Sequence, residues 1–205
     1  MLKNHFFWAS VLLLGVNLFF GFRLKESIKV AKSNSEIFSE KENYLIGNIN
    51  NATFLQSLAL RVNGMMIPEN ELTSELSKKV MLSELIDSEK FVFNFRETDC
   101  DICLEQQFAA IKALPSEVLA NDVVLIGNFS HVRDMRTFKR SNKIDLPIYM
   151  SETPLLEMAD GHGVPALFLV AENMSVTQAF FPIKEVPGLT ESFYVLVSKL
   201  LGESN

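Results

Sequence analysis

The chain has two cysteines, and both belong to one C-x-x-C motif, Cys100 and Cys103. A disulfide stabilises a fold mainly by closing a long loop in the unfolded chain, and this pair would close almost none. The spacing therefore favours redox chemistry or metal binding over a structural crosslink. A structural zinc site usually takes four protein ligands, and the histidines that remain, His5, His131 and His162, form no metal-binding pair in the sequence.

The pattern around the motif predicts how it is held. Phe91 to Phe95 (FVFNF) is a short apolar run typical of a buried strand, and the residues from Leu104 to Leu114 have apolar positions at helical spacing. The motif therefore lies at the start of a helix, where unpaired N–H groups and the helix dipole stabilise a thiolate. We expect Cys100 to be the exposed nucleophile and Cys103, one turn later, to resolve the mixed disulfide.

The remaining pattern predicts an α/β fold in which a mixed central sheet is flanked by helices. An Asn63-Gly64 turn follows the first predicted strand, and residues 79–86 read as a stretch that ends in a helical turn. The predicted strands are 54–62, 91–95, 123–129, 146–150, 164–171 and 176–181, and the predicted helices are 104–114, 131–140 and 190–201.

Composition limits the possible partners. The 205 residues are 48% hydrophobic, which excludes a largely disordered chain, and they leave room for one domain with a full core. The net charge is -6 and no basic stripe offsets it. We therefore expect no nucleic acid partner.

Residues 6–22 form an apolar run without a charge, about 26 Å long as a helix, which is at the short end of a bilayer crossing. A buried core helix and a cleavable signal peptide are the alternatives, but no small-x-small cleavage site follows the run. We expect an N-terminal membrane anchor over 1–24 that contacts the lipid bilayer through residues 6–22. A polar segment over 25–47, a helical extension followed by a tether, then leads to a domain over 48–205.

The membrane orientation has evidence on both sides. Lys3 precedes the apolar run, whereas Arg23, Lys25, Lys29 and Lys32 follow it, so the positive-inside rule would place the domain in the cytosol. A short tail before an apolar run usually acts as an export signal. We expect a single-pass membrane protein whose C-terminal domain is extracytoplasmic, on the periplasmic side, although the charge count argues against it.

Three segments together resemble the TlpA-like and ResA-like branch of the thioredoxin superfamily. They are the Leu82 to Leu85 turn (LSEL), the strand whose Asn94 lies six residues before Cys100, and Gly163 to Val170 (GVPALFLV). The resemblance covers about residues 75–181. It implies a thioredoxin-like fold and a membrane-anchored thiol–disulfide oxidoreductase.

The same resemblance implies roles for particular residues. Cys100 matches the attacking thiol and Cys103 the resolving thiol, and Asn94 matches a supporting position. Pro165 matches a cis-proline beside the disulfide, and the backbone of Val164 would pair with an extended substrate segment. By residue type alone, Pro165 would be an ordinary trans-proline at a strand edge.

The sequence departs from the family pattern around the motif. Asp99 stands where the family usually has Trp, and Ile102 where it has Pro. Gln106, with Glu105 beside it, stands where the family often has Glu, and we expect both to be supporting residues. Negative neighbours such as Asp99 disfavour a thiolate, so we hypothesise a reducing or poorly reactive couple, which Arg96 would partly offset.

The function expected from the sequence is the reduction or exchange of disulfides in extracytoplasmic proteins, with the Cys100–Cys103 disulfide as the redox group and no other cofactor. Its partners would be disulfide- or thiol-bearing proteins and a membrane or soluble electron donor. The alternative is a membrane-tethered thioredoxin-like binding module with little or no redox turnover. A carrier of copper(I) or zinc and a pair of inert thiols are further alternatives.

Overall fold

The computed structural model describes the backbone of residues 2–157 and 162–202, and side chains from residue 21 onward. The chain divides into two compact units, residues 1–50 and residues 51–205. In the first unit, the described residues belong to helix α1 (Leu2–Val62), which continues through the predicted polar segment 25–47 without a break.

The predicted membrane segment coincides with the start of α1, where the side chains of residues 6–20 lie outside the described ones. Within the part of the chain that was described and searched, no helix combines the length and the apolar character needed to cross a bilayer. The N-terminal anchor is therefore not confirmed.

The predicted strand at 54–62 is wrong, because these residues form the last turns of α1. Leu55, Leu58 and Val62 are buried, and their spacing of three and four residues places them on one helical face. These three residues belong to the second unit, and their face packs against the sheet within that unit. The apolar positions that suggested a strand are therefore the buried stripe of a helix.

The second unit contains a seven-stranded sheet in the order β2-β1-β5-β4-β3-β6-β7. Strands β3, β4 and β5 are parallel to one another, whereas β6, β7, β1 and β2 join by antiparallel pairing. This confirms the predicted mixed sheet. The strands are β1 (Glu71–Ser74), β2 (Lys79–Met81), β3 (Lys90–Arg96), β4 (Val123–Asn128), β5 (Ile148–Ser151), β6 (Ala166–Val170) and β7 (Val176–Phe180).

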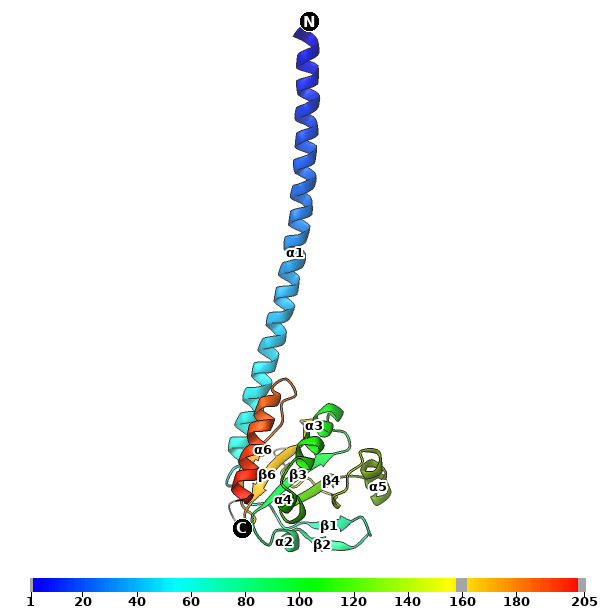
Figure 1. The fold of residues 1–205 in the computed structure, drawn as a ribbon, viewed down its shortest axis with the longest axis vertical. Helices are drawn as coiled ribbons and strands as arrows, with labels where there is room; N and C mark the ends of the chain where they lie inside the picture. Colours follow the sequence, from blue (N-terminus) through cyan, green and yellow to red (C-terminus); the bar gives the residue numbers. More distant parts are fainter. Residues whose placement is uncertain (1, 158–161, 203–205) are drawn as a thin grey trace. The chain divides into compact units, whose positions relative to one another are not determined.

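Helices cover both faces of this sheet, as Figure 1 shows for α3 and α6 in front of β3 and β6. The core on the opposite face contains the last turns of α1 and the short helix α2. The helices after α1 are α2 (Leu82–Leu85), α3 (Asp101–Lys112), α4 (Ser116–Asn121), α5 (Val132–Ser141) and α6 (Pro187–Gly202).

A cluster of phenylalanine rings forms the core behind the C-x-x-C segment. Its members, whose rings stack, tilt or meet edge to face at centroid distances of 5.0–6.0 Å, are Phe93, Phe95, Phe108, Phe129 and Phe138. Gly127 on β4 makes room for them, because a Cβ there would lie 2.3 Å from the Phe129 ring and 3.1 Å from the Phe95 ring. The packing therefore depends on a glycine at this position.

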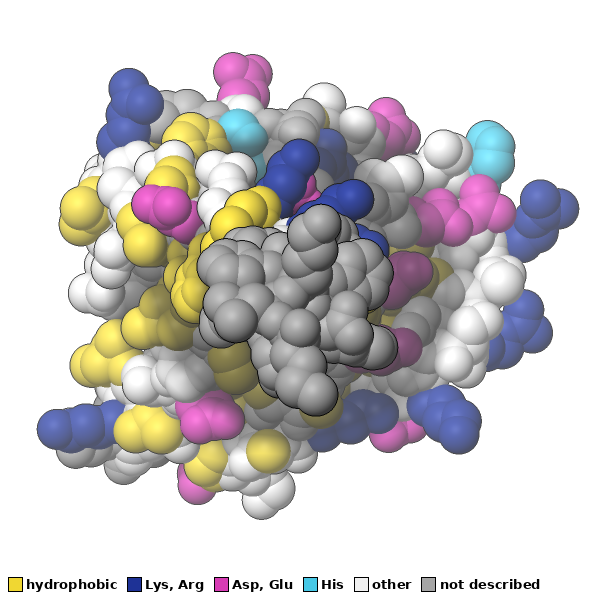
Figure 2. Space-filling model, turned by 90° about the horizontal axis from the view of Figure 1, so that it is seen from above, with side chains coloured by type: hydrophobic (Ala, Val, Ile, Leu, Met, Phe, Trp, Pro, Cys, Tyr) yellow, Lys and Arg dark blue, Asp and Glu magenta, His cyan; other side chains and the backbone are white. Residues whose placement is uncertain are grey.

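Acidic and basic side chains are interspersed on the surface that Figure 2 shows. No continuous basic stripe crosses the described part of that face. The mixture of acidic and basic side chains on this face agrees with the modest net charge of the chain.

Candidate active site

The cysteine segment is placed by the edge of the sheet at which β3 ends. Strand β3 finishes at Arg96, and α3 begins at Asp101. Strand β6 begins at the same edge and β7 ends there, because β6 is antiparallel to β3 and β7 is antiparallel to β6. Loops from three parts of the sequence therefore meet around the motif.

Asp99 fixes the turn between β3 and α3. Its carboxylate accepts a hydrogen bond from the Arg96 backbone N–H at 2.8 Å, and the Arg96 guanidinium lies 3.3 Å from it. The Asp99 N–H in turn donates to the Arg96 carbonyl. Only 2% of the Asp99 side chain is exposed, so this carboxylate is neutralised within the turn.

Cys100 lies at the N-cap of α3 and is half-buried. Its pKa is lowered chiefly because the Cys103 thiol donates a hydrogen bond to it. The backbone N–H groups of Cys103 and Ile102 and the positive charge of Lys184 act in the same direction, while partial burial opposes them. The Cys100 side chain makes no capping hydrogen bond of standard geometry. The N–H groups therefore lower the pKa of Cys100 as the positive end of the helix does.

This direction agrees with the thiolate expected at a helix start and corrects the effect expected of the negative neighbours. Negative neighbours were expected to disfavour the thiolate, but the pKa of Cys100 is lowered. Asp99 is turned toward Arg96, and Glu97 and Asp101 are exposed to solvent, which screens them. Arg96 offsets the charge as expected, by binding Asp99.

Cys103 has the opposite character. It is 2% exposed, and its pKa is raised to about 12, chiefly by burial and further by the hydrogen bond to Cys100 and the negative charges of Cys100 and Glu185. The structure holds both residues as free thiols. One accessible thiol with a lowered pKa therefore lies beside one buried thiol that keeps its proton at neutral pH.

The segment before β6 contacts the motif directly. The Cys100 N–H donates to the Gly163 carbonyl at 3.1 Å, and Gly163 has a φ of 68°, which favours glycine. Val164 is half-buried and Pro165 is buried. The predicted cis-proline is wrong, because no cis peptide bond occurs among the described residues and the bond before Pro165 is trans. Pro165 precedes the first residue of β6, a position that a trans-proline accommodates.

The predicted supporting residues are only partly brought together. Asn94 donates its side-chain N–H to the Ile126 carbonyl at 3.1 Å. It shares a cavity of about 20 Å³ with Asp99 and Val164. Glu105 and Gln106 are exposed on α3, outside this group.

The sequence analysis missed Lys184 and Glu185, which lie between β7 and α6. The Nζ of Lys184 is 3.6 Å from a carboxylate oxygen of Glu185. Both charges act on Cys103, and Lys184 also acts on Cys100. The sequence carries only an indirect signal for these two residues. Strand β7 runs parallel to β3, so the loop after β7 begins at the edge of the sheet where β3 ends.

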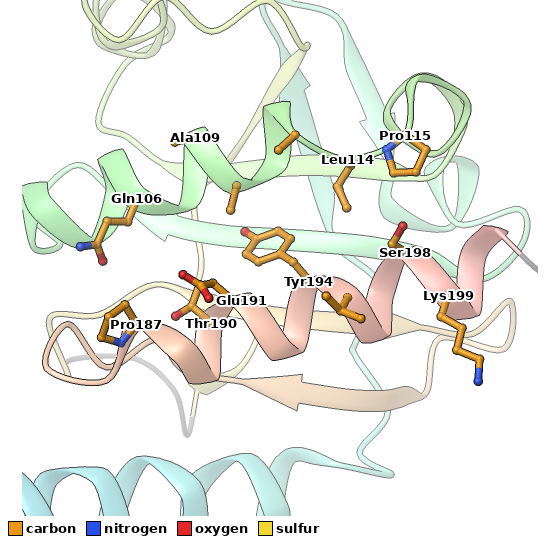
Figure 3. A pocket seen from close by; sticks show the side chains of 13 residues that line it. Gln106, Ala109, Leu114, Pro115, Pro187, Thr190, Glu191, Tyr194, Ser198 and Lys199 are labelled. Carbon is orange, nitrogen blue, oxygen red and sulfur yellow. The ribbon is translucent and has the colours of Figure 1, made fainter.

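A cavity of about 740 Å³ lies between α3 and α6, and neither cysteine lines it. Gln106 and Pro187 are near one end of it in Figure 3, and the Tyr194 ring lies between the helices. Its walls are mostly small and apolar side chains. No group of three His, Cys, Asp or Glu side chains that could hold a metal occurs within the described ranges.

No protein-family model matches the sequence, and no curated protein matches it significantly. Solved structures do match. One, described as a thiol:disulfide interchange protein DsbE from Chlorobium tepidum, has 18% identity and a TM-score of 0.52, over 66% of this chain and 96% of that one. Another, described as a protein disulfide isomerase from Bacteroides thetaiotaomicron, has 20% identity and a TM-score of 0.50, over 67% and 87%. The globular part of the chain therefore has the thioredoxin-like fold that its resemblance to the thioredoxin superfamily implied.

Proposed function

We propose that the protein is a thiol–disulfide oxidoreductase that reduces or exchanges disulfides of extracytoplasmic proteins. The observation that carries the proposal is the contrast within the motif: Cys100 is accessible with a lowered pKa, and Cys103 is buried with a raised pKa. A nucleophile and a resolving thiol require this contrast.

In the proposed reaction, the Cys100 thiolate attacks a sulfur of the partner disulfide and forms a mixed disulfide, while the other partner sulfur leaves as a thiolate. Cys103 then attacks the Cys100 sulfur. This step closes the Cys100–Cys103 disulfide and releases the second partner thiolate. A separate electron donor would return the pair to the dithiol.

The backbone beside Val164 supports the binding of a peptide partner. The Gly163 carbonyl is bonded to the Cys100 N–H, so an extended segment paired next to Val164 would lie near the nucleophile. The proposed location is a membrane, through residues 6–22, with the globular part on the extracytoplasmic side.

The test is the reduction potential of the full-length chain, purified in detergent and equilibrated in graded glutathione or dithiothreitol buffers before alkylation. A reversible two-electron couple between those of thioredoxin and the glutaredoxins, about −270 to −200 mV, is the expected result. The variant Cys103→Ser should then trap partners as mixed disulfides. A pair that closes in none of the buffers would reject the oxidoreductase in favour of a binding module.

A further inference from the structure

A surface cavity of about 670 Å³ lies along α5, and neither cysteine lines it. Five cations line this cavity against only two carboxylates, so its lining has three net positive charges. The whole chain, in contrast, has a net charge of -6. The cations of this basic cavity are Arg133, Arg136, Lys139, Arg140 and Lys143.

Helix α5 turns its apolar side chains to the core and its arginines to solvent. Met135 and Phe138 pack in the core cluster on the side of the sheet that α3 covers. Arg133, Arg136 and Arg140 are exposed. Because residues three and four apart share a face of a helix, these arginines form one row, in which neighbouring like charges repel. The row therefore does not serve the stability of the helix.

The helix dipole accounts for only part of this charge. Lys139 and Arg140 stand in the last turn of α5, where cations are favourable. Arg133 stands in the first turn, where the dipole favours an anion. Asp134 follows Arg133 and lies 3.7 Å from it, but 87% of the Arg133 side chain is exposed, so solvent screens this pair. Another function must explain the cation at this position.

Glu75 holds two of the cations in different ways. Its carboxylate pairs with Lys139 and also accepts a hydrogen bond from the Ile148 N–H at 3.0 Å. Its backbone carbonyl accepts a hydrogen bond from the Arg136 Nε at 2.8 Å. A carbonyl has no net charge, so this bond fixes the Arg136 guanidinium and leaves its positive charge available.

The turn after α5 presents the last cations. Among the described residues, Arg140 and Lys143 have no ionic partner, and both are exposed. The backbone of Lys143 is held in place, because its N–H donates to the Arg140 carbonyl at 3.2 Å and its carbonyl accepts from the Lys112 Nζ at 2.7 Å. The basic cavity therefore combines one fixed guanidinium with exposed cations on an ordered helix and turn.

The cations are arranged for a linear anion. The row from Arg133 to Arg140 is about 10 Å long at about 1.5 Å per residue, and Lys143 extends it. A single carboxylate or phosphate would meet only part of the row. An extended peptide places every second side chain on one side, about 7 Å apart, so two or three of its acidic residues would meet successive cations. Guanidinium groups bind carboxylates through two parallel hydrogen bonds.

Two other anionic partners fit less well. A flat membrane surface contacts a projecting patch rather than a cavity. The net charge of -6 repels the dense phosphates of a nucleic acid. No aromatic side chain on which bases would stack lines the basic cavity in the described part of the chain.

The first turn of α5 begins near the edge of the sheet that carries the cysteines. Strand β4 ends beside the end of β3, since Asn128 pairs with Arg96. Helix α5 starts shortly afterwards, at Val132, and Figure 1 shows it beside β4. A protein bound along α5 could therefore also reach the segment of Cys100.

We propose that the basic cavity binds an acidic peptide segment of a partner protein. Arg136, held by the Glu75 carbonyl, is the fixed anchor, and the exposed Arg133, Arg140 and Lys143 bind neighbouring carboxylates of the segment. This binding does not depend on the proposed redox chemistry, because none of these side chains touches the cysteines.

The experiment measures peptide binding to the full-length chain, purified in a nonionic detergent, by fluorescence anisotropy. The probe is a fluorescein-labelled decapeptide of alternating Glu and Ser, and the charge control has Lys in place of Glu. We expect saturable binding of the Glu peptide alone. Its affinity should fall about tenfold between about 20 and about 200 mM salt, because exposed ion pairs are screened.

Variants locate the binding. Arg133→Gln combined with Arg140→Gln should weaken binding of the Glu peptide about tenfold, since each exposed ion pair contributes modestly. Both side chains are exposed, so the fold should not change. The matched control is Lys199→Gln, which removes an exposed cation of α6 and should bind as the unaltered protein does. Exchange with a small disulfide should be the same in all three proteins.

Several results would overturn the inference. They are a Glu peptide that binds no better than the Lys peptide, and a loss of affinity in Lys199→Gln that equals that of the double variant. Displacement of the Glu peptide by a much lower concentration of a single-stranded oligonucleotide, or of phosphatidylserine in mixed micelles, would assign the cavity to nucleic acid or to lipid instead. An unaltered protein without disulfide exchange would reject the proposed function and leave the peptide result standing.

Discussion

Buried or half-buried ionisable groups lie at both ends of strand β3, but the two ends use them differently. At its start, Lys90 has 9% of its side chain exposed and lies 2.8 Å from Asp87 and 3.5 Å from Asp122, and it also donates to the Asn121 carbonyl. Beyond its end, the pKa of the Cys100 thiol is lowered and that of the Cys103 thiol is raised. Removing one member of a buried ion pair destabilises a fold, whereas groups whose protonation is poised can react.

The largest effect that tests this contrast is the loss of the nucleophile. In Cys100→Ser, disulfide exchange with a small disulfide should fall by more than about a thousandfold, because a hydroxyl does not replace the thiolate. The free energy of unfolding should change by less than about 0.5 kcal/mol, because Cys100 is only half-buried. Stopped-flow exchange and urea unfolding measure the two quantities. Retained exchange would place the reaction elsewhere in the molecule.

The opposite end should show the reverse behaviour. Lys90→Met leaves the buried Asp122 carboxylate without its cation and should cost about 3 kcal/mol, or lower Tm by about 10 °C. The exchange rate per folded molecule should not change. Calorimetry checks this against Lys78→Met, which removes an exposed lysine. Equal melting temperatures for the two variants would contradict a stabilising role for the Lys90 ion pairs.

A smaller effect should come from breaking the thiol pair. Cys103→Ala removes the hydrogen bond that lowers the pKa of Cys100, so that pKa should rise. A higher pKa leaves less thiolate at pH 7, and alkylation by iodoacetamide should slow about threefold to tenfold. Cys103→Ser, whose hydroxyl can still donate, is the control. An alkylation profile that shifts toward lower pH in Cys103→Ala would show that another group sets the pKa.

The smallest effect concerns Lys184. Lys184→Met should raise the pKa of Cys100 slightly and slow alkylation about twofold at low salt, because a half-exposed charge is largely screened. Lys199→Met, near the end of α6, is the matched control. An identical alkylation profile for the two variants would remove Lys184 from the site.

The elements next to the motif were predictable because their patterns are local. The run at 91–95 became β3 (Lys90–Arg96), and the helical spacing from 104 to 114 became most of α3 (Asp101–Lys112). Residues 54–62 were misread, because an apolar segment without Gly or Pro fits a strand and a helix equally until its packing partner is known. Short elements such as α4 (Ser116–Asn121) carry too little pattern to be predicted.

The residues of the site also divide into those that a local pattern predicts and those that only the fold brings together. Cys100 and Cys103 identify themselves by spacing, but the helix start accounts for only part of the lowered pKa of Cys100, and burial chiefly raises that of Cys103. The inward turn of Asp99 could not be predicted, since it depends on the β3–α3 turn and on Arg96. Lys184 and Glu185 belong to the site only because the sheet order returns β7 to the edge where β3 ends, and no local pattern encodes that order.

The glycine beneath the aromatic rings also limits how the sequence can vary. Because a side chain at Gly127 would overlap the Phe129 ring and crowd the Phe95 ring, substitutions at these three positions cannot be accepted independently. A variant with a larger residue at 127 would have to give up ring volume at 95 or 129, and variants with smaller residues there would tolerate alanine at 127. Among natural variants of this chain, these positions should therefore covary, even if the residues on either side of the cysteines do not.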